Sequence, residues 1–335
     1  MSNSACVSAG RIRAGLEILS LTFPFFALVL CGYVAARRSM LPLEAIAGLN
    51  GFVLFFALPC MLYRFGATTP IAQLLDASVF FIWLLCALTM VGFTIAASMN
   101  QRIAWNDASF GALVAAFPNT GFMGVPLLIA LLGSQVAGPM IITIVVDMVI
   151  TTSLCVGLSR LDVADTHGMG VAMRKALKGM LFNPLPWAIV GGVVASALQL
   201  SLLGPVERTV WLLADAASPT ALFTIGAVLA RSQILAALHV HPPIPLRDYV
   251  PVAMLKLFLH PLLVLLVGST AIQLGVPLER SALTVMVLVA ALPSASNVSL
   301  LAERFGADNG RIARIILVST AAAFLSFSLV VSLVR

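Results

Sequence analysis

Three ionisable residues lie inside long apolar stretches of the sequence, where charge is costly. Asp147 lies in the apolar run at 138–159, and Lys256 and His260 lie one helical turn apart in the run at 249–273. Apolar surroundings disfavour a charged carboxyl group, so Asp147 can carry a proton or bind a cation, with Lys256 as its partner or as the counter-charge of an anion. We therefore expect Asp147 and Lys256 to couple an ion to function, with a purely structural pair as the alternative. His260 is expected to be a packing residue.

Two further apolar stretches are interrupted by proline, glycine and small polar residues. They are residues 117–126 and 292–299. Proline removes a backbone donor and clashes with the carbonyl group one turn back, whereas glycine tolerates the dihedral angles of an unwound segment. We predict that Pro118, Pro126 and Pro293 break the helices here.

The polar residues of the two interruptions have the types that bind an anion. Hydroxyl and amide side chains can cap exposed helix ends, and the positive ends of the helices favour negative charge. The alternative is a pair of proline-kinked helices whose polar residues only bond internally. We expect Pro59 and Pro219 to form walls of the site. The expected substrate-binding residues are Asn119, Thr120, Gly121, Ser294, Ser296 and Asn297.

The composition shows that these residues belong to membrane spans. Of 335 residues, 61% are apolar and only 10% are charged, whereas a soluble domain carries about 25% charged residues. A span needs roughly 20 apolar residues, so the chain has room for about ten. This excludes a disulfide-rich secreted domain, a cytosolic enzyme and a disordered regulator. The sequence predicts an all-α polytopic membrane protein surrounded by lipid.

Ten apolar runs follow one another along the chain. They fall near 17–36, 45–63, 77–99, 108–132, 138–159, 181–203, 207–230, 249–273, 281–303 and 311–334. Prolines at 24, 59 and 118 are matched in order by prolines at 186, 219 and 293, and a chance match is the alternative. Five spans per copy means that the second copy enters the membrane inverted, as in secondary transporters. We expect ten transmembrane helices as two inverted repeats, 11–160 and 175–335, joined by a cytoplasmic linker at 161–174, with broken helices 4 and 9 crossing.

The distribution of basic residues predicts the orientation. If both termini are non-cytoplasmic, 12 of the 19 Lys and Arg residues lie in inner loops, 6 lie outside, and Lys256 lies within a span. The positive-inside rule favours this arrangement in a bacterial-type cytoplasmic (inner) membrane. The net charge of +6 then reflects cytoplasmic loops, and no nucleic-acid partner is expected.

The motifs resemble those of the auxin efflux carrier family. The matching stretches are residues 55–59, 118–127, 256–261 and 292–306, and the resemblance covers nearly the whole chain. It implies a ten-helix fold of inverted repeats in which asparagines of two crossing broken helices line the substrate site, and Asn119 and Asn297 are the matching positions. The long central loop of some plant members is absent, which implies small carboxylates such as malonate or malate rather than auxin.

We expect a secondary active transporter of a small mono- or dicarboxylate that works by alternating access. The motifs of serine hydrolases, zinc proteases and P-loop nucleotide binding are absent, and the five cysteines lack metal spacing, so we expect no enzyme, cofactor or metal. An anion channel or a membrane sensor is the alternative, as is coupling to sodium rather than protons. Small residues at 191–192, 195 and 197 permit close helix approach, and we expect a homodimer.

Overall fold

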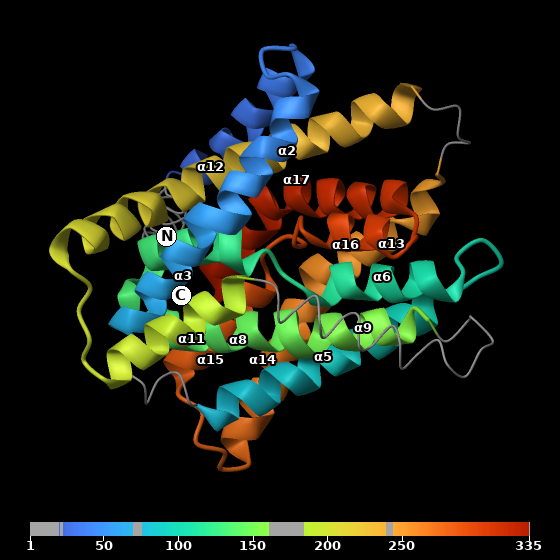
Figure 1. Cartoon of the computed structure of the whole chain (residues 1–335). Coiled ribbons are helices and arrows are strands. Elements are labelled where there is room, and N and C mark those ends of the chain that lie inside the picture. Colours follow the sequence, from blue (N-terminus) through green and yellow to red (C-terminus); the bar gives the residue numbers. More distant parts are fainter. Residues whose placement is uncertain (1–19, 21–22, 70–75, 161–183, 239–243, 335) are drawn as a thin grey trace, which may run out of the picture.

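The computed structural model describes residues 20, 23–69, 76–160, 184–238 and 244–334, and these residues are mostly helical (Figure 1). Extended pairing within this described part is limited to two isolated β-bridges, Asn100 with Ile103 and Pro118 with Ser294. The all-α class expected from the sequence is confirmed. The expected linker at 161–174 lies outside the described residues.

The helices follow the expected apolar runs, and some contain π-helical turns (η1, η2, η4, η6). The first half contains Phe23–Arg37, α2 (Leu43–Phe52), η1 (Val53–Ala57), α3 (Leu58–Thr68), α5 (Ala77–Ser98), α6 (Trp105–Ala116), η2 (Thr120–Gly124), α7 (Val125–Leu132), η3 (Ser134–Val136), α8 (Ala137–Val145), η4 (Val146–Thr151) and α9 (Thr152–Leu158). The second half contains α11 (Pro184–Ala197), α12 (Gly204–Leu238), η5 (Leu246–Asp248), α13 (Val250–Met254), η6 (Leu255–Leu259), α14 (His260–Gln273), α15 (Arg280–Ala290), α16 (Val298–Arg304) and α17 (Asn309–Val334).

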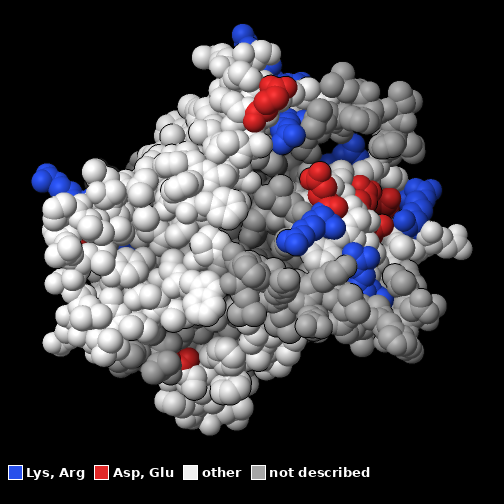
Figure 2. Space-filling model, viewed as in Figure 1, with Lys and Arg blue, Asp and Glu red and all other residues white. Residues whose placement is uncertain are grey.

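Six of the described helices are long and apolar enough to cross a membrane. They are Leu43–Thr68, Ala77–Ser98, Ala137–Leu158, Gly204–Arg231, Val250–Gln273 and Asn309–Val334. Four shorter apolar helices accompany them, namely Phe23–Arg37, Thr120–Leu132, Trp187–Ala197 and Arg280–Ala290. Figure 2 shows a wide uncharged surface, with many charged side chains gathered near the end where α6, α13 and α16 lie. This distribution is that of a protein embedded in lipid.

Three π-helical turns end directly before a helix whose second residue is a proline. The turns η1, η2 and η6 precede Pro59, Pro126 and Pro261. Proline has no amide to donate and its ring clashes with the carbonyl group four residues back, so a wider turn lets the helix continue. The prediction that Pro126 breaks a helix is therefore wrong, because the helix Thr120–Leu132 runs through it.

Two helix pairs approach so closely that glycine is required at the contact. A Cβ atom at Gly226 of α12 would overlap the carbonyl oxygen of Val29, and one at Gly192 of α11 would overlap that of Tyr63 in α3. Small residues permit this approach between helices in lipid. Gly192 thus serves packing within the chain and carries no evidence for the expected homodimer, which stays a prediction.

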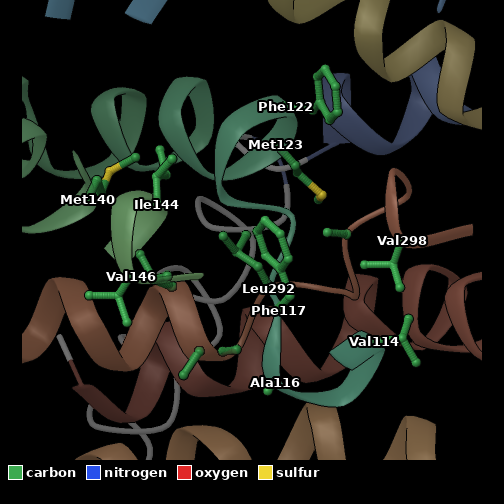
Figure 3. Packing of buried hydrophobic residues seen from close by; sticks show 14 of the residues in the cluster. Val114, Ala116, Phe117, Phe122, Met123, Met140, Ile144, Val146, Leu292 and Val298 are labelled. Atoms are coloured by element: carbon green, nitrogen blue, oxygen red, sulfur yellow. The ribbon is translucent and has the colours of Figure 1, made fainter. Parts of the chain in front are cut away.

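The buried core is centred on α6. Every residue of α6 from Ala108 to Ala116 is buried, which is the property of a helix surrounded by protein on all sides. Figure 3 shows Ala116 and Phe117 at the end of this helix, with Leu292 from the second half of the chain beside Phe117. The core therefore joins the ends of α6 and α15, where the regular helices stop.

The close helix pair at Gly226 gives a stability prediction. Replacing Gly226 by Ala forces α12 away from Val29, and overpacking of this kind costs about 1–3 kcal/mol. Thermal unfolding of the purified protein in detergent should show a lower midpoint. The matched control is Gly92→Ala in α5, where an added Cβ meets nothing within 4 Å. A Gly226→Ala variant as stable as Gly92→Ala would contradict the close approach.

Candidate functional site

Two non-helical segments meet in the interior of the bundle, and we call them the crossing segments: residues 117–119, after α6, and residues 291–297, after α15. The amide of Asn119 donates to the carbonyl oxygen of Pro293 at 2.8 Å, and the amide of Ala295 donates to that of Phe117 at 3.0 Å. Backbone groups away from water need partners within the protein. The two segments provide them for each other.

Several polar side chains at the crossing segments lack a partner. Within the described residues, the buried oxygens Asn119 Oδ1, Thr120 Oγ1, Ser294 Oγ and Asn297 Oδ1 accept or donate no hydrogen bond. A buried polar group without a partner costs free energy comparable to a lost hydrogen bond, so this arrangement fits a polar ligand.

The expected capping of the helix ends is wrong for both asparagines. Asn119 precedes η2 and Asn297 precedes α16, but neither side chain bonds to the helix that follows. The amide of Thr120 instead bonds to the carbonyl oxygen of Pro118, and that of Asn119 crosses to the other segment. At the start of α16, the amides of Val298 and Ser299 likewise bond to the carbonyl oxygens of Ala295 and Ser296, and neither asparagine side chain makes a cap bond.

A small cavity lies between the crossing segments and the helices α3 and α11. Its volume is about 30 Å³, which is room for one or two water molecules. We call it the crossing cavity. Its lining residues are Leu54, Leu58, Leu62, Phe117, Pro118, Asn119, Gly121, Phe122, Ile144, Met148, Leu185, Ala295 and Asn297.

The structure brings only some of the expected site residues to this cavity. Asn119, Gly121, Asn297 and Pro118 line it. Thr120, Pro293 and Ser294 are buried at the crossing segments without lining the cavity, and the carbonyl oxygen of Ser296 accepts the hydroxyl of Ser299.

Pro59 and Pro219 are not walls of the crossing cavity, in contrast to the prediction. Pro219 lies inside α12 with an exposed side chain, and Pro59 lies in the first turn of α3 without lining the cavity. The wall comes from Leu58 and Leu62 in α3 instead, because these residues occupy the face of the helix that looks toward the crossing. Leu185 of α11 extends the same wall.

Asp147 is fully buried in the π-helical turn η4 and bonds to two neighbours. Its Oδ1 accepts the indole Nε1–H of Trp83 at 3.1 Å and the hydroxyl of Thr151 at 3.2 Å. Its Oδ2 has no partner in the described part of the chain. The carboxyl group is thus held in place by one oxygen and leaves the other able to hold a proton.

Lys256, in the π-helical turn η6, is also fully buried, and its side chain reaches the C-terminal end of α15. Its Nζ donates to the carbonyl oxygen of Ala290 at 2.8 Å and lies 2.9 Å from Nδ1 of His260. Ala290 is the last residue of α15 before a crossing segment, and a cation at a helix C-terminus is stabilised by the helix dipole. Lys256 therefore caps the helix that leads into the crossing.

Asp147 and Lys256 do not form the ion pair that one reading of the sequence allowed. The described residues contain no such pair, and Trp83 lies between their networks, because its ring is 5.3 Å from that of His260 and its indole N–H bonds to Asp147. Sequence analysis missed Trp83. The signal available in the sequence is a tryptophan inside an apolar run, because a buried tryptophan needs a partner for its N–H group.

The described residues offer no group of three or more His, Cys, Asp or Glu side chains that could hold a metal ion. The polar groups at the crossing segments are amides, hydroxyls and backbone groups. Such groups hydrogen-bond to a carboxylate.

These features define an integral membrane transporter: a bundle of apolar helices with unpartnered polar groups enclosed at its centre. The model of the family described as "Membrane transport protein" matches residues 18–331, so the chain belongs to that family, the auxin efflux carrier family to which its motifs point.

Two relatives of known name support the assignment. The chain is 28% identical over 307 residues to the "Putative malonate transporter" of Rhizobium meliloti (strain 1021), which covers 91% of this chain and 92% of the relative. It is 26% identical over 294 residues to the "Uncharacterized transporter YfdV" of Escherichia coli (strain K12), which covers 84% of this chain and 86% of the relative.

The position of Lys256 predicts a stability effect. In Lys256→Met the carbonyl oxygen of Ala290 loses its donor inside the protein, and an unsatisfied buried group costs about 1–3 kcal/mol. Thermal unfolding in detergent should therefore occur at a lower temperature than for the parent protein. Leu259→Met, which lies in the same π-helical turn and makes no side-chain hydrogen bond, is the control. Equal stability of the two variants would show that the cap contributes nothing.

Proposed function

We propose that the protein is a secondary active transporter of a small organic anion, a mono- or dicarboxylate such as malonate or malate. The observation that carries this proposal is the pair of unpartnered side-chain amides, Asn119 and Asn297, on the wall of the crossing cavity. A side-chain amide can turn its NH₂ group toward a carboxylate, and each such bond to a charged group is strong. The printed name of the malonate relative agrees with this substrate class.

We infer that the fold consists of ten spans in two inverted repeats, with α6–α7 and α15–α16 as broken helices 4 and 9. The close helix pairs support this inference. Phe23–Arg37, the first span, packs on α12, the seventh, and α3 of the second span packs on α11, the sixth. An inverted duplication maps span 1 onto span 6 and span 2 onto span 7. It therefore maps the pair of spans 1 and 7 onto the pair of spans 6 and 2, which are the two pairs observed.

The orientation that we propose places both termini outside the cytoplasm of a bacterial-type inner membrane. The excess of basic residues in alternate loops supports it. The charged end of the molecule, near α6, α13 and α16, is then cytoplasmic (Figure 2).

Alternating access is part of the proposal because the crossing cavity is too small for a substrate. Ligand pockets usually measure about 300–1,000 Å³, whereas this cavity measures about 30 Å³. The walls must therefore part before a carboxylate enters. The anion channel and the membrane sensor are the alternative functions, and a channel would require a continuous open path.

For the coupling ion we propose a proton carried by Asp147, with Lys256 as a fixed positive charge beside the crossing segments. The unpartnered Oδ2 of Asp147 supports the assignment, because a protonated carboxyl group keeps its two bonds at Oδ1. Sodium is the alternative, since free carbonyl groups of an unwound segment can coordinate it.

Removing both site amides should strongly weaken substrate binding. Loss of one hydrogen bond to a charged group costs roughly 1.5–3 kcal/mol, or about ten- to a hundredfold in affinity. We expect Asn119→Ala, Asn297→Ala to bind carboxylates at least a hundredfold more weakly in a thermal-shift titration. Asn50→Ala, in α2 and away from the cavity, is the matched control. Uptake and binding at parent levels in the inserted double variant would rule out the crossing as the site.

The proton assignment predicts a pH effect of known sign. If the protein imports its substrate with a proton, uptake into vesicles should rise as the outside pH falls and should not depend on sodium. Asp147→Asn keeps an acceptor for Trp83 but cannot release a proton. It should abolish gradient-driven accumulation and leave substrate binding largely intact. Accumulation equal to that of the parent protein at every pH would exclude Asp147 as the proton carrier.

A further inference from the structure

Asp147 and Lys256 are linked by a chain of contacts that runs through two aromatic rings. Oδ1 of Asp147 accepts the indole N–H of Trp83 at 3.1 Å, and the centre of the Trp83 ring lies 5.3 Å from that of His260. Nδ1 of His260 lies 2.9 Å from Nζ of Lys256, which donates to the carbonyl oxygen of Ala290. All four side chains are fully buried. The two ionisable groups therefore belong to one contiguous network.

Both ends of this network adjoin the crossing cavity along the chain. Met148, the residue after Asp147, lines the cavity. At the other end, Ala290 directly precedes the crossing segment 291–297, which contributes two residues to the cavity wall. An anion in the opened cavity would thus lie near both groups. A change of charge at Asp147 would alter the binding of that anion, because charges in the interior are weakly screened.

His260 is suited to hold the lysine as an ammonium group. An ammonium group only donates hydrogen bonds, so Nδ1 of His260 accepts from Lys256 and the ring is neutral. A protonated imidazole would place two donors face to face. Nε2 of His260 is buried and has no partner in the described part of the chain, so no second hydrogen bond competes for the ring. His260 therefore orients Lys256 and does not carry the coupled proton itself.

Other ionisable side chains face the network from the helices packed on η4 and η6. These helices include α5, α6, α8, α9, α13, α14 and α17. Besides His260, their ionisable side chains are Cys86, Cys155, Asp107, Arg311 and Arg314. Arg311 donates to the carbonyl oxygen of Asp107 at the charged end of the molecule, Arg314 lies over the ring of Tyr249, and thiols are uncharged near neutral pH. Among these described groups, Asp147 is the one whose charge we expect to change during transport.

Protonation of Asp147 and binding of an anion should favour one another. An ionised Asp147 is a counter-charge for Lys256 and repels an anion in the crossing cavity. When Asp147 takes up a proton, an anion beside the crossing segments can replace it as the counter-charge. The joint binding of a proton and a monovalent anion leaves the net charge of the buried region unchanged, which avoids burying an uncompensated charge. The sign of this effect follows from these two side chains alone.

We infer that proton binding at Asp147 and anion binding at the crossing segments are coupled through Lys256, with His260 as the positioning residue that holds Lys256 between the two sites. This rests on the proposed function and adds to it the route of coupling and a ratio of one proton to each monovalent anion. By reciprocity, the proton raises the affinity for the anion by the same factor as the anion raises the affinity for the proton. Such factors are typically about 5–150-fold.

The experiment measures proton uptake during anion binding to the full-length purified protein in detergent. Acetate and malonate are the probes, and isothermal titration calorimetry is done in buffers that differ in their heat of ionisation, over the pH range in which the probe is fully ionised. We expect binding to take up protons, and the affinity to fall by about 5–150-fold as rising pH ionises Asp147. Asp147→Asn, whose amide stays neutral, should bind the probes at every pH as the parent does at the lowest pH, without proton uptake.

Two substitutions of His260 test its positioning role. His260→Leu removes an acceptor of Lys256, whereas His260→Asn keeps an amide oxygen near the position of Nδ1. In His260→Leu, Lys256 is no longer held in place as the counter-charge, so Asp147 should keep its proton to higher pH. The fall in affinity should then move to higher pH, and His260→Asn should restore the parent profile. Leu259→Met, at the neighbouring position, is the matched control. A His260→Leu variant that is less stable but has the parent pH profile would overturn the positioning role.

The outcomes separate this inference from the proposed function. If the probes bind, if Asn119→Ala, Asn297→Ala loses that binding, and if the parent protein takes up no proton, the coupling is wrong and the proposed site stands. The same conclusion holds if Asp147→Asn keeps the pH dependence of the parent, whatever the stability of His260→Leu. If neither probe binds, or if the double variant binds as the parent does, the proposed site is wrong and the inference falls with it.

Discussion

The backbone hydrogen bonds between the crossing segments are the interaction on which the rest of the site depends. A peptide group far from water must find a hydrogen-bond partner inside the protein. The interruptions at Pro118 and Pro293 remove the partners that a continuous helix would provide. The bonds from Asn119 to Pro293 and from Ala295 to Phe117 resolve this without using side chains. The side-chain amides and hydroxyls of the crossing segments are therefore free to bind a ligand. The two helix interruptions together form a candidate site.

The same constraint explains the position of the buried lysine. A helix that ends inside the protein exposes carbonyl groups at its C-terminus, and α15 ends at Ala290 with Lys256 bonded to it. The structural and functional interpretations of Lys256 are thus compatible, since a charge needed to end a helix also sets the electrostatic potential beside the crossing segments. Asp147 is bonded to Trp83 and Thr151 instead, and the Trp83 ring, which packs against His260, lies between Asp147 and Lys256.

The sequence predicted the features that arise from local chemistry and missed those that arise from packing. Proline acts on its own helix, so the interruptions at Pro118 and Pro293 and the asparagines beside them were visible in the sequence. The continuous helix through Pro126 was not, because a π-helical turn relieves the clash. The walls at Leu58 and Leu62 depend on which face of α3 looks inward. Trp83 bonds to a residue 64 positions away, and no periodicity reports such a pair.

The distribution of directional and non-directional contacts shows how the proposed alternating access could proceed at low cost. Hydrogen bonds hold the crossing segments together and form one part of the molecule. The helix pairs that meet at Gly192 and at Gly226 form the other part, and close backbone contacts hold them together. The boundary between these parts passes through the crossing cavity, where leucine, isoleucine and methionine meet. Apolar contacts are non-directional, so the leucine, isoleucine and methionine side chains described at this boundary can shift past one another without losing a fixed bonding geometry. In the proposed transport cycle, the apolar boundary is therefore both a wall of the crossing cavity and the surface along which the two parts move.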